Sequence, residues 1–213
     1  PIWAAAGPNA ICMVSGTSGT FTGGVTHAAG YVTGNGSTSD FSVGATPSAL
    51  GISTGDAFIM RGIHINSPTT SYSTCGVGAS SAASSLILLN YSSTTGTTYF
   101  RQPSSAAQVT LTGQGSEYRG IYIGSSTATN ARFLLRRRSG GTTVATSTAS
   151  DTQSIFDQAP RFLARNLNGI VQTRTDGSEF AWAVGTGMTE AQAGDFTAAL
   201  ETMWETCTGL TLF

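Results

Sequence analysis

The chain has 213 residues, and only 10% of them carry a charged side chain. All ten basic residues are arginine and the net charge is −1, so the chain lacks the broad positive charge that attracts nucleic acid or an anionic membrane. No stretch is long and apolar enough to span a bilayer, and no basic leader precedes an apolar core. We therefore expect no nucleic-acid partner, no membrane insertion and synthesis in the cytoplasm.

Serine, threonine and the 27 glycines dominate the sequence, as is typical of strands joined by turns rather than of helices. The length fits one large β domain, so residues 1–213 are predicted to form a single unit. Its first part, residues 1–40, is a Gly/Thr-rich segment broken into short candidate strands at Ala10 to Ser15 and Thr26 to Thr33. This segment is either an edge of the sheet structure or an arm that docks onto a neighbouring subunit.

From Asp40 onward the strand pattern is firmer, with a long candidate strand from Asp56 to Asn66. Several later segments alternate apolar and polar residues, which predicts strands with one buried face. The further candidates are Ser85 to Tyr91, Thr97 to Arg101, Gln108 to Thr112, Tyr118 to Ile123, Arg132 to Arg138 and Thr142 to Ser147. Ser139-Gly140-Gly141 marks a hairpin between the last two, because adjacent glycines supply the positive φ of tight turns.

The C-terminal quarter combines an apolar strand, in which Phe180, Trp182 and Val184 alternate with alanines, and an amphipathic helix from about Thr189 to Thr206. Thr189 and Gln192 have the spacing of a capping box. The helix is expected to bury one face that consists of Phe196, Leu200, Met203, Trp204 and Cys207. Many short strands and one terminal helix favour an antiparallel β-sandwich over a strand-helix alternation.

Two segments resemble a known family. The order F-L-A-R-N, N-G, apolar strand, G-x-G-M-T-E-A-Q-A and helix in residues 162–206, and the strand, Gly-Gly and T-T-V-A-T hairpin, resemble concanavalin A-like lectin/glucanase (LamG-like) domains of tailed-phage virion proteins. The resemblance covers about Asp40 to Thr206. It implies an all-β jelly-roll sandwich with one short C-terminal α-helix, located at the surface of a virion.

Cys12, Cys75 and Cys207 are an odd number without C-x-x-C spacing, so they are interpreted as structural thiols, with Cys207 buried in the helix face. No metal site and no cofactor is predicted. The resemblance makes calcium conceivable, but no acidic loop has the spacing of a calcium site.

The sequence contains none of the catalytic motifs that we considered. Glycan-cleaving members of the concanavalin A-like superfamily carry an E-x-D-x-E strand that places two carboxylates on one face, whereas the carboxylates here are scattered. No G-x-S-x-G elbow and no phosphate loop is present. These observations predict that the chain is not an enzyme, with a glycan hydrolase as the less favoured alternative.

Arg136-Arg137-Arg138 is the one local charge cluster. Alternation would place Arg136 and Arg138 on one face and Arg137 on the other, which divides the patch. We expect two exposed arginines that guard a sheet edge or meet a carboxylate of a neighbouring subunit.

Aromatic rings commonly hold sugars, because an apolar ring face stacks on C–H groups. Tyr72, Tyr91, Tyr99 and Tyr118 fall in turn-rich segments, and the carbohydrate-binding prediction is Tyr91, Tyr99 and Arg101. Half-buried structural tyrosines are the alternative interpretation of the same pattern. Trp182 and Trp204 are interpreted as core residues.

The sequence therefore predicts a non-catalytic virion surface protein, as a head or tail fibre, spike or decoration component, whose lectin-like sandwich binds host-surface polysaccharide. Other virion proteins are expected partners, and a symmetric homo-oligomer is expected. The alternative is a purely architectural capsid or fibre subunit that uses residues 1–40 as its docking arm.

Overall fold

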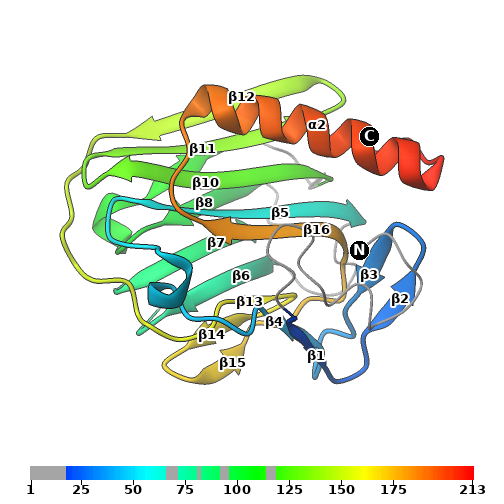
Figure 1. The fold of residues 1–213 in the computed structure, drawn as a ribbon, viewed down its shortest axis with the longest axis horizontal. Coiled ribbons are helices and arrows are strands. Elements are labelled where there is room, and N and C mark those ends of the chain that lie inside the picture. The colour runs from blue at the N-terminus through cyan, green and yellow to red at the C-terminus, as the bar shows by residue number, and fades with distance from the viewer. Residues whose placement is uncertain (1–17, 66–71, 81–82, 92–95, 114–118) are drawn as a thin grey trace.

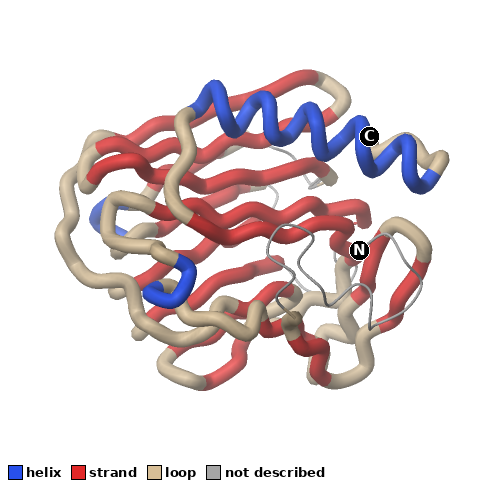
Figure 2. The backbone as a smooth tube through the Cα atoms, in the orientation of Figure 1, coloured by secondary structure: helices blue, strands red, loops and turns tan. Residues whose placement is uncertain are grey.

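The computed structural model describes residues 18–65, 72–80, 83–91, 96–113 and 119–213. Within them the chain forms two β-sheets that face each other, with one long helix on the outside (Figures 1 and 2). This arrangement confirms the predicted all-β sandwich with a C-terminal helix. No helix among the described residues combines the length and the apolar character needed to cross a bilayer.

The first sheet contains nine strands, and all of its pairings are antiparallel except that β14 runs parallel to β6. Across the sheet the order is β1 (Thr20–Thr22), β4 (Asp40–Ser42), β13 (Arg161–Phe162), β6 (Tyr72–Gly78), β7 (Ser85–Tyr91), β8 (Thr97–Arg101) and β9 (Val109–Leu111). The hairpin of β14 (Arg165–Leu167) and β15 (Ile170–Gln172) adds to it beside β6.

The second sheet contains seven antiparallel strands. Their order is β12 (Gly141–Ser147), β11 (Ala131–Arg138), β10 (Gly120–Ala128), β5 (Ala57–Ile65), β16 (Ser178–Gly185), β3 (Tyr31–Thr33) and β2 (Thr26–Ala28). The predicted hairpin at Ser139-Gly140-Gly141 joins β11 to β12. Two short 3-10 turns, Ser48–Leu50 and Ser105–Ala107, lie in the connections.

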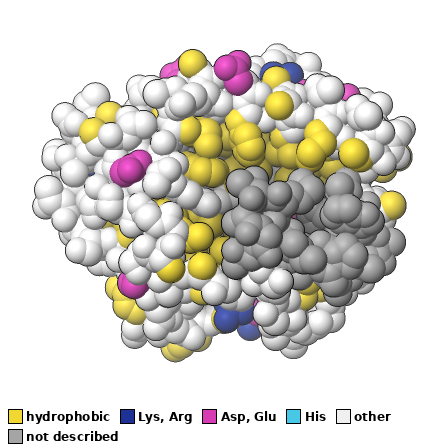
Figure 3. Space-filling view, in the orientation of Figure 1, with side chains coloured by type: hydrophobic (Ala, Val, Ile, Leu, Met, Phe, Trp, Pro, Cys, Tyr) yellow, Lys and Arg dark blue, Asp and Glu magenta, His cyan; other side chains and the backbone are white. Residues whose placement is uncertain are grey.

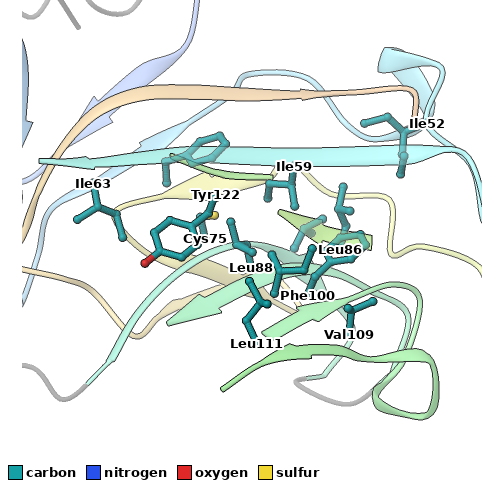
Figure 4. Packing of buried hydrophobic residues seen from close by; sticks show 14 of the residues in the cluster. Ile52, Ile59, Ile63, Cys75, Leu86, Leu88, Phe100, Val109, Leu111 and Tyr122 are labelled. Carbon is teal, nitrogen blue, oxygen red and sulfur yellow. The ribbon is translucent and has the colours of Figure 1, made fainter. Parts of the chain in front are cut away.

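The main hydrophobic core lies between the two sheets. Alternate residues of each strand point inward, so Ile59 and Tyr122 of the second sheet meet Leu86, Leu88 and Phe100 of the first (Figure 4). All five side chains are fully buried. Removing that much apolar surface from water is the dominant stabilising contribution to a sandwich of this kind.

A second apolar layer lies on the outer face of the second sheet, beneath α2 (Glu190–Thr208). Trp204 of the helix packs there against Phe180, and its indole N–H donates to the Gly30 carbonyl at 2.7 Å. The predicted capping box of Thr189 and Gln192 is present at the start of the helix. Hydrophobic side chains extend along and below α2 on this side of the molecule (Figure 3).

The buried face of α2 differs from the predicted one. Ala193, Thr197 and Trp204 are its buried residues, whereas Phe196 is 37% exposed and Cys207 is exposed as a free thiol. The prediction of a buried Cys207 is therefore wrong. The small side chains at 193 and 197 let the helix approach the sheet closely, which rotates the contact face away from Phe196.

Strand β16 contains a bulge that the alternation pattern does not predict. Glu179 pairs with Ile63 and Ala181 pairs with Gly62, so Phe180 is an extra residue. Phe180 consequently joins the layer under α2, while Trp182 packs against the inter-sheet core. A Cβ atom on Gly62 would lie 2.3 Å from the Phe180 ring, so glycine makes room for the bulged residue.

Residues 1–17 of the Gly/Thr-rich segment 1–40 lie outside the described residues. The whole candidate strand from Ala10 to Ser15 falls in that part. From residue 18 onward this segment supplies β1 to the first sheet and β2 and β3 to the second. The docking role of residues 1–40 stays a prediction.

Candidate functional site

The outer face of the first sheet places the predicted binding residues together. The register pairs Leu89 with Tyr99 and Ile87 with Arg101, while Phe100 points to the core. Because strand side chains alternate, Tyr99 and Arg101 lie on the face that points away from the second sheet. That face is the opposite side of the sandwich from α2.

Tyr99, Arg101, Gln108 and Thr110 form a connected strip on this face, here called the Tyr99 strip. The Arg101 guanidinium lies over the Tyr99 ring, 5.5 Å from its centroid. Arg101 Nε donates to Gln108 Oε1 at 2.6 Å, and Gln108 Nε2 lies 3.0 Å from the Thr110 hydroxyl. These contacts fix the planar guanidinium and amide groups beside a half-exposed aromatic ring.

The ring is anchored from below. Tyr99 packs against the cluster that the buried side chains of Ile87 and Leu167 form on this face, the latter from β14. A rigid aromatic platform with hydrogen-bonding groups at its edge is the arrangement that sugar binding requires, because one group takes the C–H face and the other takes the hydroxyls.

The other predicted tyrosines are only partly described. Tyr91 pairs with Thr97, so its register position belongs to the same face as Tyr99. The side chains of Tyr72 and Tyr91 lie outside the described residues, as does all of Tyr118. The carbohydrate-binding role of Tyr91, Tyr99 and Arg101 stays a prediction.

Gln108 and Thr110 were missed in the sequence interpretation. A 3-10 turn separates them from Arg101 in the sequence. Strands β8 and β9 pair Tyr99 with Thr110 and so bring these residues next to Arg101. The only sequence signal for them was the alternation of Gln108, Thr110 and Thr112 against Val109 and Leu111. That pattern indicates an outward face without showing which strand adjoins it.

A group of arginines, the arginine cluster, lies on the same outer face beyond Ile87. It consists of Arg161 and Arg174, which lie against Asp40, and of Arg165, which pairs with the same β6 residue, Gly76, as Arg161 does. Arg161 forms an ion pair with Asp40, and Arg174 Nη2 lies 3.7 Å from Asp40 Oδ2. The carboxylate is 2% exposed, whereas the Arg161 and Arg174 side chains are about one quarter exposed.

A second ionic group is enclosed between the sheets. Arg61 pairs with Glu179, which also accepts a hydrogen bond from the Trp182 indole N–H, and both charged side chains are fully buried. Burial raises the pKa of Glu179, while the Arg61 charge and the Trp182 hydrogen bond act to lower it. Because this carboxyl is closed off from solvent, it is placed to stabilise the core rather than to touch a substrate.

The same inter-sheet layer holds Arg136, contrary to the predicted exposed position. Its side chain is fully buried over the Tyr122 ring, and Nη2 donates to the Arg119 carbonyl at 3.1 Å. Arg137, on the other face, pairs with Glu201 of α2 at 2.5 Å. The prediction that Arg136 and Arg138 are exposed arginines at a sheet edge is wrong, because β12 forms the edge beside β11 and Arg136 is buried between the sheets.

Cys75 and Cys207 are both free thiols in the part of the chain that the structure describes. Cys75 is a buried free thiol whose pKa rises to about 12 through burial, an inert state at neutral pH. No group of three or more His, Cys, Asp or Glu side chains that could hold a metal ion occurs in the part of the chain that the structure describes. Cys12 lies outside that part.

A shallow cavity of about 190 Å³ lies at one end of the second sheet, beside the β11–β12 turn. Arg119, Arg138, Ser139, Gly140 and Phe213 line it. It has two cationic groups but no aromatic platform on a strand, which makes it a less suitable sugar site than the Tyr99 strip.

Comparisons with known proteins give a likeness in fold. Neither a family model nor a curated protein matches the sequence. A solved structure, the enzymatically active domain of tailspike protein 2 of bacteriophage CBA120, aligns with a TM-score of 0.53 and 11% identity. The alignment covers 87% of this chain and 29% of that one, so the chain spans less than a third of the tailspike structure.

This comparison contradicts the prediction that the chain is not an enzyme. A domain of similar fold is described as enzymatically active, so the missing E-x-D-x-E strand does not exclude catalysis. That motif belongs to one catalytic arrangement, and a fold can carry others. The finer placement in the concanavalin A-like superfamily stays a prediction.

Proposed function

We propose that this chain is a surface protein of a bacteriophage virion that binds host-surface polysaccharide through the Tyr99 strip. The observation that carries the proposal is the half-exposed Tyr99 ring, which packs against the Ile87–Leu167 cluster and is flanked by Arg101 and Gln108. The likeness to a tailspike domain and the sequence resemblance to phage virion proteins support the assignment to a virion.

The chemistry of the strip fits a saccharide. Stacking of a sugar on Tyr99 would bury C–H surface, while the Arg101 and Gln108 side chains offer hydrogen bonds to ring hydroxyls. Since these two side chains are already held by one hydrogen bond, little side-chain entropy is lost on binding. Other virion proteins and further copies of this chain are its proposed partners in the particle.

The test is an array of purified host-surface polysaccharides probed with the full chain. Tyr99→Ala should weaken binding about tenfold, because stacking energy is lost with the ring. Tyr99→Phe should keep most of the affinity. Phe196→Ala, which removes an exposed ring from α2 on the opposite side, is the matched control and should change nothing. Equal binding by the wild type and Tyr99→Ala would rule out the strip as the site.

Hydrolysis of the bound polysaccharide is a second candidate function, favoured by the description of the tailspike domain as enzymatically active. Its measurement is the release of reducing ends from a polysaccharide that the array identifies. Hydrolysis would be supported if replacing one carboxylate by its amide abolished this release. The first variants are Asp151→Asn and Asp157→Asn, because both carboxylates lie in the partly exposed segment before β13. Binding without release would remove this candidate and leave the binding function in place.

A further inference from the structure

The outer face of the first sheet is more positively charged than the chain as a whole. Asp40 is the only acidic residue in its nine strands, whereas Arg101, Arg161 and Arg165 all lie in them. Arg174 joins this group from the loop after β15, and the nearby Asp176 packs beside Gly36. Even with Asp176 counted, four arginines face two carboxylates, although the whole chain has a net charge of −1.

The positive charge has two separate centres on this face. The register places Arg165 beside Gly76, Gly76 beside Ile87, and Ile87 beside Arg101. Three strand spacings therefore separate the backbones of Arg165 and Arg101, a distance of about 14 Å. Ile87 lies between the two centres, and Tyr99, two residues before Arg101 on β8, packs against the cluster that Ile87 forms with Leu167.

Solvent reaches both centres. Arg101 and Tyr99 are half-exposed, and the side chains of Arg161 and Arg174 are each about one quarter exposed. Guanidinium groups bind carboxylate and phosphate with paired, charge-assisted hydrogen bonds. A solvent-accessible face with two such centres about 14 Å apart, one of them beside an aromatic ring, is complementary to an extended chain that carries repeated negative charges.

We infer that the polysaccharide recognised by this face is acidic, with carboxylate or phosphate groups that meet Arg101 at one end and the arginine cluster at the other. This inference rests on the proposed polysaccharide-binding function and names the class of its ligand. The aromatic ring supplies the saccharide contact, and the arginines select for charge.

The experiment compares four probes: alginate, carboxyl-reduced alginate, a teichoic acid and neutral dextran. Alginate tests the carboxylate, the teichoic acid tests the phosphate, and the other two carry neither charge. We expect at least one acidic probe to bind and both neutral probes to bind at least tenfold more weakly, with affinity falling as NaCl rises from about 0.05 to about 0.3 M.

Variants then locate the charge. The double substitution Arg165→Gln and Arg174→Gln should weaken acidic binding about tenfold. Arg138→Gln removes the same kind of charge from the far cavity and should have no effect. Arg101→Gln, measured alongside, keeps the test valid if the double variant unfolds, because it removes the other centre and should also weaken binding.

Each alternative outcome has a distinct meaning. Equal binding of neutral and acidic probes, or acidic binding that the arginine variants leave unchanged, would overturn the inference while the Tyr99→Ala result still decides the proposed function. Binding to duplex DNA as tightly as to the acidic probes would show a general polyanion surface and would also overturn it. Failure to bind any polysaccharide, here and on the host array, would remove the proposed function itself.

Discussion

The two outer faces of this sandwich differ in what covers them. The second sheet is covered by α2, whose Trp204 and Ala193 pack on Met60, Ile121 and the other apolar residues of that face. The first sheet presents the Tyr99 strip and the arginine cluster to solvent. The amphipathic helix α2 thus covers one outer face and adds buried apolar surface, whereas the other outer face carries the strip for which we propose polysaccharide binding.

The strongest way to break this division is Trp204→Ala. The substitution removes a fully buried indole and its hydrogen bond to Gly30, and should lower the free energy of unfolding by about 3–5 kcal/mol. Chemical denaturation monitored by circular dichroism measures the loss. Polysaccharide binding at a temperature where the variant is still folded should be unchanged, and a parallel loss of binding would contradict the separation of the two faces.

A smaller effect is expected from Gly62→Ala, which tests the contact between the β16 bulge and the sheet beneath it. The new methyl group would meet the Phe180 ring, so overpacking should cost about 1–3 kcal/mol. Gly194→Ala in α2 is the matched control, because a methyl group added there would have no atom within 4 Å beyond the backbone of its own helix. That control should stabilise the protein by about 1 kcal/mol through helix propensity. Thermal unfolding of both variants would show opposite shifts, and two shifts of the same sign would be incompatible with this packing.

The smallest effect concerns the ionic contact between α2 and the second sheet. Glu201→Gln should cost about 0.2–1 kcal/mol, because the pair with Arg137 is partly exposed and screened by water. The difference from the wild type should shrink further at about 1 M salt. Denaturation at low and high salt measures it, and a larger, salt-independent loss would mean that Glu201 has a packing role.

Local sequence signals predicted the elements well where they depend on neighbouring residues. The Thr189 and Gln192 capping box fixed the start of α2, and adjacent glycines fixed the β11–β12 hairpin. Such local signals do not show which element covers which face of a sheet. Arg136 was therefore predicted to be exposed and Cys207 to be buried, and the structure reverses both. Burial of Arg136 depends on Tyr122, which lies in the neighbouring strand β10, and on the carbonyl of Arg119, the residue just before that strand.

The candidate site was predictable only in part, for the same reason. Tyr99 and Arg101 share a strand, so alternation alone places them on one face. The β8–β9 pairing brings Gln108 next to them. The arginine cluster joins the same face because β13 and β14 pair into this sheet, although about sixty residues of sequence separate them from β8. Long-range strand order determines these neighbours, and periodicity carries no information about it.

The extra residue in β16, Phe180, points to the layer under α2, while other side chains of this strand point to the inter-sheet core. Because Phe180 is inserted between two paired positions, Glu179 and Trp182 face Arg61 while the phenyl ring turns toward the helix. Deleting that single residue would restore regular pairing, because Glu179 would remain opposite Ile63, and Trp182 opposite Arg61. The ion pair between Arg61 and Glu179 would then stay in place, while the apolar layer beneath Trp204 would lose a phenyl ring. The bulge thus supplies an aromatic side chain to the outer layer without changing which residues of β16 face the inner one.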